Sequence, residues 1–379
     1  MLEVMVAQIR ASDPRAAIGI MTATSEASRA ARRLGFQPEE VFLASMDRVL
    51  EACCKYGEVM VMGADVLDGA YSPETSVFVW RTAELCHEHG VGARIVGSSF
   101  NQQPDPAVCS VVRSLRLRFP VCCRDPQSLR RLRRLSSGNL NLTADVAFLL
   151  EPSASPGIRV QLAGRWIEWQ KRQKRQVIAV NISQHCVHGE SASGVLEFLS
   201  SLAGALQSTA RSADISVLLL PHDIRSNSDD RSLLENLRRS LRSTLRSRVL
   251  LLKYRASAAE VKGLVGKVDM LLTGRMHLAV AALSQIVPPA SFVYQGKFEG
   301  LYEHFGLPEW LMIRPSARSQ KARLETVLEQ MIAEREALGS QIRARLPFVL
   351  ALAEKNFSCH QARAYPQDAP QDEGPPRQA

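Results

Sequence analysis

The stretch Val268-Asp-Met-Leu-Leu-Thr273 runs directly into Gly274-Arg-Met-His277, and the apolar residues 278–283 follow without a break. The first part has the length and composition of a buried strand, whereas the second part predicts a helix. Another apolar run, residues 290–294, predicts a second strand after that helix. Because parallel strands need a long crossover between them, this order of elements predicts a parallel sheet in an α/β fold.

The same alternation of short apolar runs and longer amphipathic stretches fills both halves of the 379-residue chain. We expect strands at residues 16–22, 58–63, 92–98, 118–123 and 145–150, and then at residues 177–182, 216–221, 249–254, 268–273 and 290–294. Turn formers concentrate in Glu151-Pro-Ser-Ala-Ser-Pro-Gly157, where we place a domain boundary. We therefore expect mostly parallel sheets in two α/β domains, residues 1–157 and 176–318. A helical segment at 319–357 and a disordered tail at 358–379 complete the expected organisation.

The chain carries a formal net charge of +9, and most of its 47 basic residues are Arg. Arginine suits anionic partners because its planar guanidinium donates paired hydrogen bonds to carboxylates and phosphates. The basic runs at residues 130–134 and 238–239 lie in helical patterns with Leu at core spacing. No aromatic residues that could stack on bases interrupt them, so we expect solvated helix faces and no nucleic-acid partner.

The eight cysteines include the adjacent pairs Cys53-Cys54 and Cys122-Cys123, but no CxxC motif. Their spacing relative to histidine does not match a tetrahedral metal site, so we expect no metal. This cysteine usage favours a reduced, cytoplasmic protein. No apolar run approaches the roughly 20 residues that cross a bilayer, so we expect membrane contact to be at most peripheral.

Three basic side chains are predicted to meet at one edge of the second sheet. Arg275 and His277 lie where a strand ends and a helix begins, and Lys297 follows the next strand, 20 residues after His277. Consecutive parallel strands end at the same sheet edge, where ligands bind in open α/β folds. The group would suit a phosphorylated carboxylate, with Arg275 as a fork, Lys297 as a point charge and His277 as hydrogen-bond donor or general acid.

A second candidate site follows another predicted strand, in Leu220-Pro-His222-Asp223. His222 and Asp223 could bind a sugar hydroxyl and accept its proton. An ordinary loop, with Asp230 or Ser228 capping the next helix, explains the same residues slightly better.

The chain resembles the polysaccharide pyruvyl transferase family. The matching motifs are Val268 to His277, Tyr294-Gln-Gly-Lys-Phe-Glu-Gly300 with Phe305-Gly-Leu307, and, in the first half, Val121-Cys-Cys-Arg-Asp125 and Thr143-Ala-Asp145. The resemblance implies two Rossmann-like domains that face a cleft in a GT-B-like arrangement. It also implies that phosphoenolpyruvate binds Arg124, His277 and Lys297 as a co-substrate, without another cofactor. The implied reaction transfers pyruvate, as a ketal, to a sugar of a cell-surface polysaccharide or its lipid-linked precursor.

The N-terminal sequence departs from the family pattern. The family's opening strand and Asn/Gly/Asp loop have no counterpart, and its early Gly-Gly pair is here Gly63-Ala64. The first βα unit is therefore missing or rebuilt, which leaves two other functions open. One is a nucleotide-sugar glycosyltransferase of similar fold, in which Glu299 or Glu303 would bind a ribose. The other is a non-catalytic relative that binds a glycan.

Overall fold

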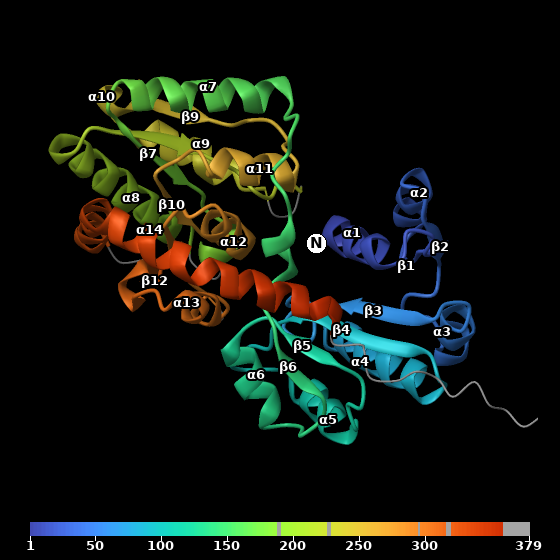
Figure 1. Ribbon diagram of the computed structural model, residues 1–379. Coiled ribbons are helices and arrows are strands. Elements are labelled where there is room, and N and C mark those ends of the chain that lie inside the picture. Colours follow the sequence, from blue (N-terminus) through green and yellow to red (C-terminus); the bar gives the residue numbers. More distant parts are fainter. Residues whose placement is uncertain (188–190, 226–228, 295, 316–319, 359–379) are drawn as a thin grey trace, which may run out of the picture.

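The computed structural model describes residues 1–187, 191–225, 229–294, 296–315 and 320–358. Two large sheets form from separate stretches of the chain (Figure 1), and all the described strands pair in parallel. The first sheet has the order β3 (Glu58–Met62), β4 (Gly92–Ser98), β5 (Val121–Cys123) and β6 (Leu140–Leu142). The second has the order β12 (Met312–Ile313), β11 (Pro289–Phe292), β10 (Met270–Thr273), β7 (Gln176–Val180), β8 (Ile215–Leu219) and β9 (Val249–Leu251).

The N-terminal sheet is packed against four helices. The first, α3 (Met46–Cys53), precedes β3, and the other three follow strands of the sheet: α4 (Pro73–Glu88), α5 (Pro106–Ser114) and α6 (Pro126–Arg133). Side chains of β4 and β5 are buried on a core that includes Trp80, whose indole donates to the Leu67 carbonyl at 3.0 Å. The prediction of a strand at residues 92–98 is confirmed at both ends, because a continuous buried run leaves little ambiguity.

The first forty residues form a small unit beside this sheet. After α1 (Leu2–Ser12), strand β1 (Gly19–Met21) pairs only with β2 (Gln37–Glu39), and α2 (Ser25–Arg33) connects the two. The predicted strand at residues 16–22 thus exists in part, but it belongs to a separate two-stranded sheet.

The C-terminal sheet is buried on both faces. One face packs on α8 (Ala192–Ser212), α9 (Arg231–Ser240) and α13 (Glu299–Phe305), and the other on α7 (Ile158–Arg172) and α11 (Ala258–Val265). The helix predicted after Thr273 is α12 (Met276–Ser284), and it leads into β11 beside β10. Arg275 and His277 therefore lie at the carboxyl edge of this sheet, as the sequence predicts.

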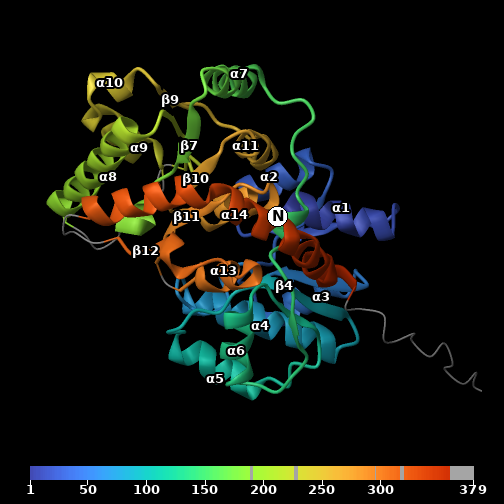
Figure 2. The same ribbon diagram turned by 60° about the vertical axis from the view of Figure 1, so that its left-hand side comes forward.

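The helix α14 (Lys321–Ser358) joins the two domains. It packs along α8 and then reaches β4 in the N-terminal domain (Figures 1 and 2). Near its end, the buried Asn356 accepts from the Gly97 amide and from Arg94 and donates to the Ala144 carbonyl, each at 2.9 Å. The disordered tail predicted at residues 358–379 lies, apart from Ser358, outside the described residues.

Two expectations about residues 145–175 need correction. The strand expected at residues 145–150 is wrong: Val146–Leu149 form a short 3₁₀ helix, η1, because the Asp145 carboxylate accepts from the Ala147 amide at 2.9 Å. No helix is predicted between the two domains, yet α7 lies there. Its apolar residues occupy two opposite faces, which obscures the 3.6-residue period of an amphipathic helix. Among the described helices, none is long and apolar enough to cross a membrane.

Candidate active site

Arg124, His277 and Lys297 come together where the two sheets face each other. Arg124 directly follows β5, and His277 lies in the first turn of α12 after β10. Lys297 precedes α13, five residues beyond the end of β11 at Phe292. Each position is the carboxyl end of a parallel strand, so the topology alone brings the three residues to one cleft.

Asp145 connects two of these basic residues. Its Oδ2 accepts from the Arg124 guanidinium at 3.1 Å and lies 3.6 Å from His277 Nε2. Burial alone would raise the pKa of Asp145, but His277, Arg124 and the Ala147 amide hold that pKa well below its usual range. Asp145 is therefore ionised, and its charge draws the imidazole and the guanidinium together.

Arg124 is held in place from three sides. Besides Asp145, its guanidinium donates to Ser99 Oγ at 2.9 Å, and its carbonyl accepts from His304 Nε2 at 2.9 Å. Its side chain is only 4 % exposed. A guanidinium fixed in this way is preorganised, because little side-chain entropy remains to be lost when a ligand binds.

Lys297 forms an ion pair with the opposite domain. Its Nζ donates to Asp65 Oδ2 and to Tyr71 Oη, both at 2.7 Å, and lies 4.8 Å from the centre of the Tyr71 ring. Burial raises the pKa of Asp65, but Lys297 and Arg124 outweigh it and lower that pKa to about 2. The carboxylates of Asp65 and Asp145 thus neutralise much of the positive charge that the sequence suggested.

Arg275 points into a different network. Its guanidinium donates to the fully buried Asp230 at 2.6 Å and lies 3.5 Å from Asp223. Asp230 also accepts from the Asn181 side chain at 2.9 Å and from the backbone amides of His222 and Asp223 at 3.1 and 3.0 Å. These contacts fix the loop after β8 and the start of α9, and the role of Arg275 as an anion fork stays a prediction.

Asp223, predicted as a base, is also paired. Arg225 binds its carboxylate in a bidentate manner, with Nε at 3.0 Å and the second nitrogen at 2.5 Å. Burial would raise the pKa of Asp223, but Arg225 and Arg275 lower it well below its usual range. A carboxylate with so low a pKa accepts a proton weakly at neutral pH.

His222 lies beside this network with its Nδ1 buried and without a hydrogen-bond partner among the described residues. Burial, with smaller contributions from His277 and Arg275, lowers the pKa of His222 from 6.5 to about 4. The folded protein therefore keeps this imidazole neutral at pH values where the unfolded chain protonates it.

This difference predicts a pH dependence of stability. Between about pH 6.5 and 4 the unfolded state binds the additional proton, so the free energy of unfolding should fall as the pH falls through this range. Chemical denaturation at a series of pH values measures the slope, and His222→Gln should reduce it. The lowered carboxylate pKa values add a loss of the same sign below about pH 5, so the comparison of the unmodified protein with His222→Gln isolates the contribution of the histidine. An unchanged slope in the variant would contradict the assignment to His222.

Gly274 allows the end of β10 to approach the segment after β7, around Ser183 and Cys186, at the carboxyl edge of the C-terminal sheet. A Cβ at this position would lie 2.1 Å from Cys186 Sγ and 3.0 Å from the Ser183 backbone nitrogen. Only glycine fits the contact without displacement of the 3₁₀ segment Gln184–Val187.

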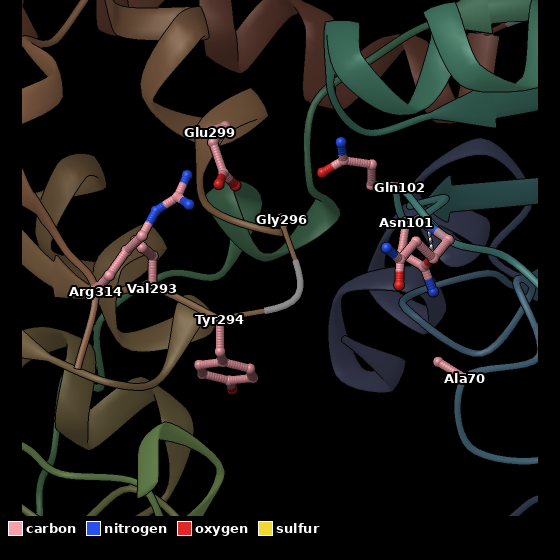
Figure 3. A pocket seen from close by; sticks show the side chains of 9 residues that line it. Ala70, Asn101, Gln102, Val293, Tyr294, Gly296, Glu299 and Arg314 are labelled. Atoms are coloured by element: carbon pink, nitrogen blue, oxygen red, sulfur yellow. Dashed lines mark hydrogen bonds between the residues drawn. The ribbon is translucent and has the colours of Figure 1, made fainter. Parts of the chain in front are cut away.

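A pocket of about 430 Å³ opens between the domains next to Lys297. Figure 3 shows Val293, Tyr294, Glu299 and Arg314 on one side, and Ala70, Asn101 and Gln102 on the other. The Oε2 atom of Glu299 is buried and has no hydrogen-bond partner in the described part of the chain. An aromatic ring with amides and a carboxylate suits a hydroxyl-rich ligand.

Several residues of the site are absent from the sequence-based prediction. Asp65, Tyr71, Ser99 and His304 each contact Lys297 or Arg124, yet they are distant from them in sequence. Asp145 had a signal, because it ends the Thr143-Ala-Asp145 motif. Within the described ranges no three His, Cys, Asp or Glu side chains are grouped so that they could hold a metal ion.

Solved structures with a similar fold are nucleotide-sugar enzymes. Staphylococcus aureus MnaA, solved with UDP, has a TM-score of 0.60 at 11% identity, covering 93% of this chain and 90% of that chain. The UDP-GlcNAc 2-epimerase from Neisseria meningitidis, bound to UDP-GlcNAc, has a TM-score of 0.56 at 12% identity and 93% coverage of each chain. Anabaena Alr3699/HepE, in complex with UDP and glucose, has a TM-score of 0.55 at 12% identity and 93% coverage of each chain. These similarities confirm the fold: two Rossmann-like domains in a GT-B-like arrangement.

Sequence comparison identifies the family. A search of curated proteins gave no significant match. The model of the polysaccharide pyruvyl transferase family matches residues 76–296, which is more than half of the chain and includes Arg124, Asp145 and His277. The chain belongs to the polysaccharide pyruvyl transferase family.

Proposed function

We propose that the protein transfers a pyruvyl group from phosphoenolpyruvate to a sugar as a ketal. The observation that carries this proposal is the convergence of Arg124, His277 and Lys297 from both domains on one cleft, linked by Asp145 and Asp65. Three basic side chains match a donor that carries a carboxylate and a phosphate. They also match a transition state whose leaving group gains negative charge.

The reaction balances with two sugar hydroxyls. Protonation of the donor's methylene carbon produces an oxocarbenium-like centre at C2, which the first hydroxyl attacks. Phosphate then leaves, and the second hydroxyl closes the ketal. Of the two hydroxyl protons, one replaces the proton delivered to the methyl group and the other departs with phosphate.

We assign the proton transfer to His277 and the binding of the donor's anionic groups to Arg124 and Lys297. His277 is 39 % exposed, so it can reach a bound substrate, while Asp145 orients its ring. Arg275 and His222 act indirectly in this proposal, since they shape the adjoining loop. Asp223 can serve as base only after its pair with Arg225 opens.

The pocket beside Lys297 is our candidate site for the acceptor. Tyr294 offers a ring for stacking on a sugar, and Asn101, Gln102 and Glu299 offer polar groups for its hydroxyls. The acceptor is a sugar unit of a cell-surface polysaccharide or of a lipid-linked precursor.

Phosphate release from phosphoenolpyruvate in the presence of candidate glycans tests the reaction. We expect Lys297→Ala to raise the KM for phosphoenolpyruvate roughly 10- to 100-fold, since a charge-assisted hydrogen bond is worth about 1.5–3 kcal/mol. Lys321, exposed at the start of α14 away from the cleft, gives the control variant Lys321→Ala. Tight binding of a UDP-sugar, with no phosphate released from phosphoenolpyruvate in the presence of any acceptor, would support the glycosyltransferase reading instead.

Asp65→Asn should have the opposite effect on donor binding. Asp65 forms an ion pair with the Lys297 ammonium, so an anionic donor must compete with its carboxylate. Removing that charge should tighten phosphoenolpyruvate binding roughly fivefold, because a partly exposed ion pair is worth about 1 kcal/mol. Isothermal titration calorimetry measures the change in affinity for phosphoenolpyruvate. Weaker binding by Asp65→Asn would mean that the carboxylate positions Lys297 for the donor and does not compete with it.

A further inference from the structure

The helix α7 carries apolar side chains on its solvent face. Its buried face is formed by Val160, Ala163 and Ile167, which pack against β7 and α11. Ile158, Leu162 and Trp169 lie four and seven residues apart in succession, so they align on the opposite face. They are 62, 54 and 48 % exposed, so this stripe faces solvent, away from the domain core.

This concentration is specific to α7. Eleven large apolar side chains are exposed in the described part of the chain, and three of them are on this helix. Every other described element carries at most one of the remaining eight. Tyr254, half exposed in the segment after β9, extends the stripe, because the guanidinium of Arg159 lies 3.3 Å from the centre of its ring.

Basic residues border the stripe. Arg165 and Arg172 are exposed on the same face of α7, and Lys253 and Arg255 are exposed on either side of Tyr254. The one acidic residue of the helix, Glu168, forms an ion pair with Lys267. The surface therefore combines two aromatic rings and two aliphatic side chains with an excess of positive charge.

We propose that this surface, Ile158, Leu162, Trp169 and Tyr254 with the surrounding cations, docks on an anionic lipid bilayer. Trp and Tyr favour the boundary between headgroups and acyl chains, where Leu and Ile insert and Arg and Lys bind acidic headgroups. Figures 1 and 2 place α7 at the end of the C-terminal domain farthest from the N-terminal sheet, so a flat surface can approach it.

The charge argues against a second copy of the chain as the occupant. A symmetric dimer would place this surface against itself and bring Arg165 and Arg172 of two copies together. Repulsion between like charges opposes that contact, whereas a bilayer rich in acidic lipids is complementary to it. The inference is independent of the proposed reaction, since it involves neither the donor nor the cleft.

Vesicle flotation of the 379-residue chain tests the proposal. We expect binding to vesicles of phosphatidylcholine with phosphatidylglycerol and little binding to phosphatidylcholine alone. The variant Ile158→Ser/Leu162→Ser/Trp169→Ser, and separately Arg165→Glu/Arg172→Glu, should lower the partition coefficient roughly tenfold or more. Matched controls change equally exposed side chains elsewhere: Leu34→Ser/Leu196→Ser/Phe348→Ser and Arg33→Glu/Arg113→Glu.

A second readout does not depend on substitutions at several positions. The fluorescence of Trp169 should shift to shorter wavelength on the anionic vesicles and be quenched by brominated lipid, and Trp169→Phe should lose that signal. Equal flotation of the α7 variants and their controls would overturn the proposal. So would a concentration-dependent dimer that dissociates when the apolar stripe is replaced, because a second copy would then be the occupant.

Discussion

His277→Ala should lower kcat for phosphate release roughly 10²- to 10⁴-fold, the range that a positioned acid or base contributes. The imidazole lies 3.6 Å from Asp145, a buried and ionised carboxylate that orients the ring. No other described histidine lies as close to Asp145, and His222 remains neutral because burial lowers its pKa to about 4. The variant therefore removes the proposed proton donor while Arg124 and Lys297 still bind phosphoenolpyruvate.

The comparison of kcat with donor affinity distinguishes chemistry from binding. His277→Gln keeps a hydrogen-bond donor but transfers no proton, so it should lose kcat as well while it retains most of the affinity. His89→Ala, at the exposed C-terminal end of α4, is the matched control and should behave as the unmodified protein. If His277→Gln retained full kcat, the histidine would only hold phosphate and another group would move the proton.

Asp230→Ala should cost about 3–5 kcal/mol of unfolding free energy, the range for removal of one partner from a buried ion pair. Asp230 is fully buried and accepts from Arg275, from Asn181 and from two backbone amides. The substitution leaves the Arg275 guanidinium without its principal counter-charge and leaves several donors without an acceptor. Guanidinium denaturation at neutral pH measures the loss.

Asp229→Ala is a control one residue away. Asp229 pairs with Arg231 at the surface, where the two side chains are 24 and 44 % exposed, so its removal should scarcely change stability. A similar small effect at Asp230 would mean that solvent reaches Arg275 and that the network does not hold the loop.

The sequence predicts this fold well because buried parallel strands are continuous apolar runs. The run Gly92–Ser98 and the passage from β10 into α12 could be recognised from local pattern alone. The helix α7 was missed for the opposite reason. Its exposed Ile158, Leu162 and Trp169 break the expected alternation of apolar and polar faces.

The site is only partly predictable, since its charges are balanced by residues far away in the chain. Arg275 and Lys297 both look like anion ligands at strand ends. Asp230 precedes Arg275 by 45 residues, and Asp65 precedes Lys297 by 232. No local pattern connects such pairs, because they meet only when loops of different strands reach the same cleft.

The contacts of Asn356 affect the order in which the two domains can fold during translation. The side-chain amide of Asn356 accepts from the Gly97 amide and donates to the Ala144 carbonyl. The backbone carbonyl of Asn356 accepts from Arg94. On the ribosome, these partners are synthesised more than two hundred residues before it. The N-terminal domain therefore lacks these three hydrogen bonds until nearly the whole C-terminal domain has emerged. Domain-by-domain folding during translation is incomplete for such a chain, because the docking of α14 completes the first domain.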